Sequence, residues 1–331
     1  MKVISNSTFQ LKNNQVIYGL NIKKEMNHKK LKISITIFII LLLSEFVLRH
    51  YFGFCDAVLM QEDPDFEYIS RPDQNRYRFG KHIYYNHFSM RSEEVDSTAE
   101  IILGFGDSIF NGGTFLDQDS IASTILSKNL TKQKGHKIQF LNISSGSWGP
   151  DNCFAYLKKY GNFNCKKIYL IVSSHDAYDN MNFEKVVGIH FRYPNKQYKL
   201  ALLELVDRYI IPETKKKLGM NIYKTEESEL DKKGINTGFN SGFNSFYEYA
   251  KRNKIPLTIY LHASKSEIKQ NHYNEQGVEI INFAKSKGIP LLTDLQNGIT
   301  ENDLRDKIHY SNSGQKKMAD IIIDKFCISA K

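Results

Sequence analysis

Short apolar runs alternate with segments of helical periodicity from about residue 100 to the end of the chain. A continuous apolar run that stops at Gly, Ser, Asn or Asp is typical of a strand buried on both faces of a sheet. Five such runs predict strands within residues 100–108, 137–146, 166–174, 255–264 and 289–295. Because helical segments separate them, the pattern predicts an α/β fold: a doubly wound, flavodoxin-like, five-stranded parallel sheet with helices on both faces.

Apolar residues at helical spacing predict the helices of this domain, which we assign to residues 98–331. The helices are expected at 120–130, 243–254, 274–288 and 313–326. Between about 177 and 240 the alternation breaks, and a helical piece at 199–210 stands among polar residues. In α/β folds, insertions after the carboxyl end of a strand often form lids and substrate walls, so we expect such a role for this segment.

The longest apolar stretch, residues 33–54, precedes this domain and predicts one transmembrane helix, a signal-anchor. As a helix its 22 residues would reach about 33 Å, enough to cross a bilayer. Glu45 and Arg49 are four apart, so they can pair on one helix face. Three aromatic residues would anchor the outer interface: Tyr51, Phe52 and Phe54.

Lysines dominate the residues before the span. Residues 1–32 hold seven lysines and one acid, Glu25, which gives +6 of the formal net charge of +9 and leaves +3 for the rest of the chain. This distribution is a topology signal and disfavours nucleic acid as a partner. By the positive-inside rule, 1–32 is a basic cytoplasmic tail of a single-pass inner-membrane protein whose C-terminal domain is periplasmic.

Two alternatives for the apolar stretch stay open: the hydrophobic part of a cleaved signal peptide, and a buried core helix. No small-x-small cleavage site follows the stretch, and the lysines before it disfavour a core helix. The true start is Met1 or Met26, because Met26 opens a complete basic region of its own. Residues 55–97 are rich in aromatic side chains and are expected to form short strands and turns that wrap the next domain.

The four cysteines are Cys55, Cys153, Cys165 and Cys327, and no pair has the spacing of a metal site. We therefore expect no metal and no cofactor. In an oxidising compartment Cys153 and Cys165 could pair, a question that the sequence leaves open.

Residues capable of nucleophilic chemistry stand at the predicted carboxyl ends of the strands, where such folds bind ligands. The first strand ends on Gly106-Asp107-Ser108, and Asp306 and His309 follow the last strand three residues apart. Ser108 would be the nucleophile, His309 the base that takes its proton, and Asp306 the acid that orients the imidazole. Asp107 is expected to cap the turn.

These motifs resemble those of the SGNH, or GDSL, hydrolase family. "GDSI" at Gly106–Ile109 matches the first block of the family, and "DKIH" at Asp306–His309, followed by Gly314, matches the last. The resemblance covers roughly residues 98–331, and envelope members of the family also carry a membrane anchor before this domain. It implies an acyl-Ser108 intermediate and an oxyanion hole.

The two middle blocks of the family are altered in this chain. The oxyanion glycine falls at Ser147, with Gly146 beside it, and the oxyanion asparagine falls at His175 in "SSHD". The backbone N–H of Ser147 can still donate to an oxyanion, and His175 can donate when the facing ring nitrogen carries a proton. We therefore assign Gly146, Ser147 and His175 to the oxyanion and substrate-binding site.

The sequence thus predicts a membrane-anchored serine esterase of the SGNH type. Its substrate would be an acylated glycan of the envelope or a secreted one, or another small ester, and O-acetyl is the acyl group expected. The alternatives are a glycan O-acetyltransferase with the same triad and a catalytically inert glycan-binding module. The glycan, the protein partner and the oligomeric state are left open.

The remaining residues near the strand ends are expected to have mainly structural roles. Asn142 is expected to satisfy a turn, and Trp148 either packs or stacks on a sugar. Asp176 and Asp179 are expected to be solvated loop carboxylates. Three histidines have no partner at motif spacing, so the sequence assigns them no role: His190, His262 and His272.

Overall fold

The computed structural model describes residues 4–220 and 238–328, with side chains from residue 26 to 220 and from 238 to 325. Its centre is a five-stranded sheet in the order β6-β5-β7-β8-β9, and every neighbouring pair of strands is parallel. The strands are β5 (Glu100–Gly106), β6 (Ile138–Ser144), β7 (Lys167–Ser173), β8 (Leu257–His262) and β9 (Leu291–Thr293). The predicted α/β fold and the five predicted strands are confirmed.

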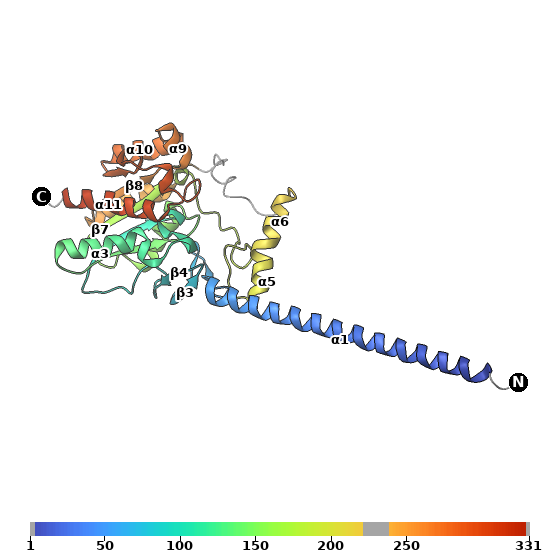
Figure 1. Cartoon of the computed structure of the whole chain (residues 1–331). Coiled ribbons are helices and arrows are strands. Elements are labelled where there is room, and N and C mark those ends of the chain that lie inside the picture. The colour runs from blue at the N-terminus through green and yellow to red at the C-terminus, as the bar shows by residue number, and fades with distance from the viewer. Residues whose placement is uncertain (1–3, 221–237, 329–331) are drawn as a thin grey trace.

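Helices cover both faces of the sheet (Figure 1). On one face α3 (Ala122–Lys134) packs against α11 (Asn312–Ile328), and on the other α4 (Pro150–Tyr160) packs against α8 (Ser241–Asn253). The ring of Phe243 in α8 also contacts Phe283 of α10 (Glu275–Lys287). The strand side chains between these layers are buried, as continuous apolar runs require, for example Leu103, Phe105, Ile143, Leu170 and Ile259.

The strand order reverses beside β5, because its two neighbours are β6 on one side and β7 on the other. Loops that leave the carboxyl ends of strands at such a reversal separate and leave a crevice between them. The loops after β5, β6 and β7 carry Ser108, Ser147 and His175, so three of the predicted site residues follow these three strand ends.

Two antiparallel hairpins precede the sheet: β1 (Met60–Asp63) with β2 (Glu67–Ser70), and β3 (Gln74–Arg78) with β4 (Lys81–Tyr85). The fully buried Arg91 follows them and donates to the carbonyl oxygens of Asn111, Gly113 and Leu116. Trp148 is also buried, lies edge-on to Phe66 and donates to the carbonyl oxygen of Tyr68. Of the two roles expected of Trp148, packing is therefore correct.

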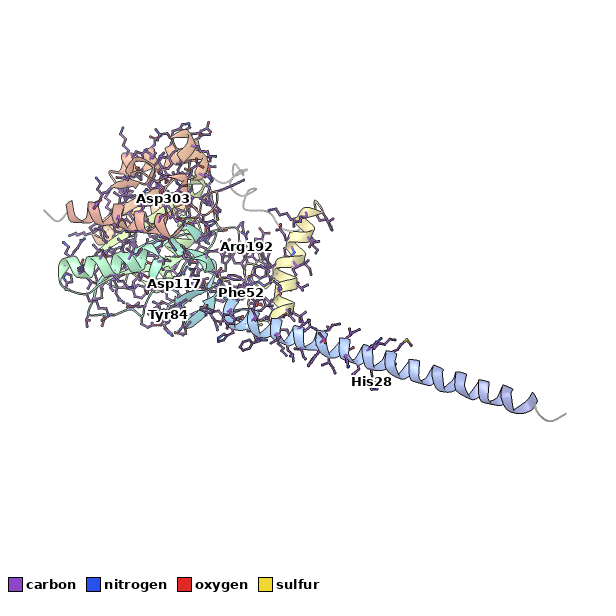
Figure 2. All side chains as sticks on the ribbon, in the orientation of Figure 1. His28, Phe52, Tyr84, Asp117, Arg192 and Asp303 are labelled. Atoms are coloured by element: carbon purple, nitrogen blue, oxygen red, sulfur yellow. The ribbon has the colours of Figure 1, made fainter. Side chains whose placement is uncertain are left out.

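The N-terminal helix α1 (Ile4–Phe52) projects from the domain, and Figure 2 shows His28 far from the domain and Phe52 at the domain. Within the described residues, Met26–Phe52 is the one helical stretch long and apolar enough to cross a membrane. The predicted pair forms, with Nε of Arg49 2.6 Å from Oε1 of Glu45. The prediction that Phe54 anchors the outer membrane interface is wrong. The helix ends at Phe52, Gly53 takes a φ of 65°, and the side chain of Phe54 is buried in the domain.

Part of the predicted insertion is helical, as α5 (Ala201–Leu205), a π-helical turn η4 (Val206–Ile210) and α6 (Ile211–Lys217) follow one another. Residues 221–237 of it lie outside the described part of the chain. Cys153 and Cys165 are free thiols, so the open question of their pairing is answered in the negative, while the side chain of Cys327 lies outside the described residues.

Candidate active site

Ser108 is the first residue of the short helix α2 (Ser108–Asn111), directly beyond the end of β5. Asp107 caps this helix, since its Oδ1 accepts a 2.8 Å hydrogen bond from the N–H of Ile109. A side chain at Gly106 would place its Cβ 2.9 Å from Cβ of Phe110 and 3.0 Å from the carbonyl oxygen of Ile171. The small residue before Asp107 therefore lets α2 fold back onto β7, and this leaves Ser108 half-buried at the crevice.

Ser108, His309 and Asp306 form one hydrogen-bonded chain, although Ser108 and His309 are 201 residues apart. Nε2 of His309 lies 2.9 Å from Oγ of Ser108. Nδ1 of His309 lies 3.0 and 2.9 Å from the two carboxylate oxygens of Asp306. A proton on Nδ1 shared with the carboxylate leaves Nε2 as the acceptor that faces the serine hydroxyl, which is the tautomer a general base requires.

The carboxylate of Asp306 is held in its ionised form. Burial by itself raises the pKa of this carboxyl, but hydrogen bonds from His309 and from the backbone N–H groups of Ile308 and His309 outweigh it and lower the pKa. The carboxylate therefore stays charged at neutral pH and can stabilise an imidazolium on His309.

A second histidine supports this loop from behind, although no motif in the sequence points to it. His262, at the end of β8, is fully buried, with Nδ1 2.6 Å from Oδ2 of Asp294 and Nε2 2.6 Å from the carbonyl oxygen of Ile308. Both partners accept only, so both ring nitrogens must carry protons. Burial lowers the pKa of His262, but the charge and hydrogen bonds of Asp294 prevail and raise it.

Asp294 collects further donors at the same place. Tyr310, the residue after His309, donates its hydroxyl to Oδ2 at 2.5 Å, and the N–H of Ala263 donates to Oδ1 at 2.9 Å. Tyr273 donates to Oδ1 at 3.2 Å. Both neighbours of His309 in the chain, Ile308 and Tyr310, are thereby fixed to one buried ion pair.

The predicted oxyanion residues after β6 lie in the turn before α4. Ser147 adopts a φ of 56°, and the carbonyl oxygen of Gly146 accepts a 2.9 Å hydrogen bond from the hydroxyl of Tyr68. Among the described residues no acceptor binds the N–H of Gly146 or that of Ser147. No hydrogen bond joins either residue to the triad, so their role in an oxyanion hole stays a prediction.

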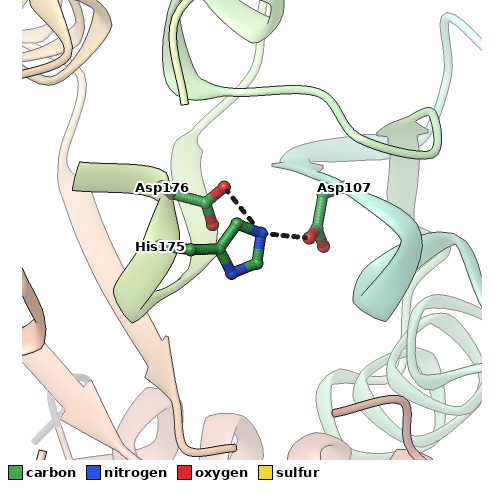
Figure 3. A group of neighbouring side chains, drawn as sticks. All are labelled: Asp107, His175 and Asp176. Atoms are coloured by element: carbon green, nitrogen blue, oxygen red, sulfur yellow. Dashed lines mark ion pairs between the residues drawn. The ribbon is translucent and has the colours of Figure 1, made fainter. Parts of the chain in front are cut away.

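His175 stands in η3 (Ser174–Ala177) between two carboxylates (Figure 3). Its Nε2 lies 3.8 Å from Oδ2 of Asp107 and 3.6 Å from Oδ1 of Asp176, and its Nδ1 lies 2.8 Å from Oγ of Ser173. It is thus next to the residue that precedes Ser108 and makes no hydrogen bond to the triad within the described structure. Its predicted donation to an oxyanion stays a prediction.

Asp176 corrects the sequence interpretation, because it is buried rather than solvated. Its Oδ2 accepts from the N–H of Ser173 at 2.7 Å, while its Oδ1 has no hydrogen-bond partner among the described residues. Burial, and then the charge of Asp107, raise its pKa well above the ordinary range. These two aspartates and His175 lie close enough to share a metal ion.

A cavity of ≈ 390 Å³ lies against the loop that joins Asp306 to His309, and none of the three triad residues lines it. His175 and Ile308, the neighbour of His309, form part of its wall. The rest of the lining is mainly polar and includes Ser264, Ser266, Lys269, Asn274, Gln276 and Lys307. Hydroxyl, amide and ammonium groups of this kind suit a hydroxylated ligand better than a long alkyl chain.

Asn142 has a different role from the one expected. It lies within β6, fully buried, and donates to the carbonyl oxygen of Phe110 at 2.9 Å and to Oγ of Ser123 at 3.2 Å. Asn142 therefore joins the strand to the segment after Ser108 instead of forming a turn.

Comparisons with known proteins add the following findings. No family model and no curated protein matches the sequence. Among solved structures, a member of the lipolytic G-D-S-L family from Veillonella parvula DSM 2008 aligns at 10% identity over 69% of this chain and 99% of its own, with a TM-score of 0.38. An acetyl-xylooligosaccharide esterase from Geobacillus Stearmophilus aligns at 12% identity over 69% of this chain and 94% of its own, with a TM-score of 0.39.

A two-domain esterase active on acetylated mannans aligns at 12% identity over 69% of this chain and 49% of its own, with a TM-score of 0.42.

Proposed function

We propose that this protein is a serine esterase of the SGNH type, held at a membrane by α1, which removes O-acetyl groups from a glycan. The observation that carries the proposal is the hydrogen-bonded chain from Oγ of Ser108 through His309 to Asp306. A hydroxyl becomes a useful nucleophile when a positioned base accepts its proton, and this chain supplies such a base.

The reaction follows from this chain. As Oγ of Ser108 attacks the ester carbonyl, Nε2 of His309 takes its proton, and the ionised Asp306 stabilises the imidazolium that forms. The same proton then passes to the departing alcohol, which leaves an acyl group on Ser108. A water molecule, deprotonated by His309, attacks this acyl-enzyme and releases the carboxylic acid and free Ser108.

Stabilisation of the oxyanion is assigned to backbone N–H groups at Ser108 and Ser147, with Gly146 beside them, and to His175. The N–H groups of Gly146 and Ser147 are without acceptors among the described residues, which supports this assignment. The positive φ of Ser147 gives its backbone an orientation that ordinary turns do not.

The polar lining of the cavity beside His175 supports a glycan as the substrate. Acetyl is the acyl group proposed, because the cavity lining offers polar groups rather than the apolar channel that a long acyl chain would need. The long apolar helix and the lysines before it support a single-pass anchor in the inner membrane, with the catalytic domain in the periplasm.

One experiment separates the esterase from its alternatives. The full chain in detergent micelles is given an O-acetylated polysaccharide with and without a second, unacetylated sugar, and both free acetate and acetylated acceptor are measured. An esterase releases acetate without the acceptor, a transferase acetylates the acceptor, and a binding module does neither. The Ser108→Ala variant should lose whichever of these two activities the parent shows. A variant that still releases acetate or acetylates the acceptor would contradict the proposal.

A further inference from the structure

The helix formed by α5, η4 and α6 stands apart from the sheet and presents a set of large apolar side chains to its surroundings (Figure 1). Leu203, Val206, Ile210 and Ile211 are each at least 38% exposed. The first three recur at three- and four-residue spacing, and Ile211 follows Ile210 directly. The flanking Leu200, Leu218 and Met220 are exposed as well. Contiguous exposed apolar surface of this kind marks a binding face.

The opposite side of this helix is locked to the domain. Glu204 is fully buried, and its carboxylate binds Arg78 at 2.5 Å, Arg208 at 2.8 Å and the N–H of Cys55 at 2.5 Å. Arg78 also donates to the hydroxyl of Tyr209 at 2.8 Å. Rotation of the helix would break these bonds, so the apolar face is held outward.

The same helix starts against the domain end of α1. The carboxylate of Glu45 accepts hydrogen bonds from the N–H groups of Ala201 at 2.8 Å and Leu202 at 3.0 Å, and Arg49 binds the carbonyl oxygen of Lys199. Glu45, an acid inside an apolar stretch, thereby caps α5. Figure 1 shows α5 starting beside the domain end of α1 and α6 leading away from α1 at a steep angle, on the side of the domain from which α1 projects.

We propose that the helix 201–217 lies in the interfacial layer of the bilayer, with Leu203, Val206 and Ile210 in contact with lipid. The inference rests on the proposed anchoring by α1, because α5 begins against Glu45 and Arg49, in the last two turns of the apolar stretch Met26–Phe52. Three lysines close the helix, Lys215, Lys216 and Lys217. Basic residues beside an apolar face are typical of helices that bind anionic lipid surfaces.

Contact of the helix 201–217 with lipid, in addition to the span by α1, would fix how the catalytic domain sits on the membrane. A single helix allows the domain to swing about its junction, whereas two contacts fix its tilt and its height above the bilayer. The catalytic crevice would then face substrate at one orientation.

Tryptophan fluorescence tests the proposal, because the chain has one native tryptophan, Trp148, and it is buried in the domain. The full chain is reconstituted in vesicles of phosphatidylglycerol and phosphatidylcholine in equal parts, with or without bromine on the acyl chains. Three variants each add one tryptophan at an exposed site: Ile210→Trp on the proposed interfacial face, Phe38→Trp in α1, and Val278→Trp on α10 as the water-facing control.

The added emission of Ile210→Trp should shift to shorter wavelength than that of Val278→Trp, lose intensity in brominated vesicles, and resist acrylamide. Emission that matches Val278→Trp would overturn the inference, because the face would then be in water. Short-wavelength emission without bromine quenching would also overturn it, since protein rather than lipid would cover the face. Bromine quenching of Phe38→Trp reports on α1 independently, so its absence would instead contradict the proposed anchor.

Discussion

Nε2 of His262 donates a 2.6 Å hydrogen bond to the carbonyl oxygen of Ile308, the residue immediately before the proposed catalytic base. The other ring nitrogen binds the buried carboxylate of Asp294, so both ring nitrogens carry protons and the imidazole is charged. This ion pair holds the backbone on both sides of His309, through Ile308 and Tyr310. His262 is therefore a positioning residue, because it acts on the reaction only through the loop that carries His309.

Replacing His262 should lower turnover more than substrate binding. In His262→Gln the loop loses its hydrogen bond at Ile308 and moves His309 relative to Ser108, which should lower kcat by roughly 10- to 100-fold, the cost of a displacement of about 1 Å. KM for p-nitrophenyl acetate should change little. The matched control is Tyr273→Phe, which removes a weaker hydrogen bond to Asp294 and should keep kcat near the value of the parent. A rise in KM alone in His262→Gln would contradict the positioning role.

The His262–Asp294 pair also makes stability depend on pH. The pKa of His262 is raised in the folded protein, so its contribution is complete below the unfolded pKa of about 6.5 and is lost as pH rises through the folded pKa. The Tm of the parent minus the Tm of His262→Gln should therefore fall as pH is raised from about 6 to about 9. Scanning calorimetry of both proteins measures this difference, and a constant difference across the range would contradict the charged state.

The strands and the closeness of Asp306 to His309 could be predicted from the sequence, because both depend on local signals, whereas Ser108 is 201 residues from His309 and only the family resemblance connected the two. Continuous apolar runs mark the strands, and Asp306 lies three residues from His309. His262 could not be found in this way, since its partners Asp294 and Ile308 are 32 and 46 residues away and only the fold joins them.

Two further differences between sequence and structure have local causes. The helices predicted from the sequence do not include α4; in the structure Pro150 occupies the first turn of this helix, where its missing N–H costs nothing. The apolar character of Phe54 alone predicts a place at the membrane interface. The structure packs its ring 4.8 Å from the guanidinium of Arg78, a contact that hydropathy cannot indicate.

His175 offers a test of the oxyanion assignment. If its side chain donates to the oxyanion, His175→Asn should keep much of the activity, because an amide supplies a donor, whereas His175→Ala should lose on the order of 100-fold in kcat. Steady-state hydrolysis of p-nitrophenyl acetate compares the two variants. Equal and small losses would mean that His175 only fills the loop beside Asp107 and Asp176.

The buried pair of Glu204 and Arg78 should matter greatly for stability. Glu204→Ala leaves the guanidinium of Arg78, which is 2% exposed, without its carboxylate, and such a loss costs about 3–5 kcal/mol. Urea unfolding in detergent micelles should show this decrease in the free energy of unfolding. Glu213→Ala, an exposed acid on α6, is the control and should change stability by less than about 0.5 kcal/mol; a similarly small effect for Glu204→Ala would contradict the described network.

The central claim is that Ser108 is a nucleophile activated by His309, and labelling with a fluorophosphonate measures it most directly. The probe leaves a phosphorus adduct that resembles the tetrahedral intermediate, so only an activated serine reacts quickly. The account predicts one labelled site, Ser108, identified by mass spectrometry of the full chain in detergent. Ser108→Ala should abolish the label, His309→Ala should slow it strongly, and Asp306→Asn should slow it comparably or less. A parent protein that stays unlabelled between about pH 6 and 9, where a histidine base becomes neutral, would contradict the account and favour a glycan-binding module.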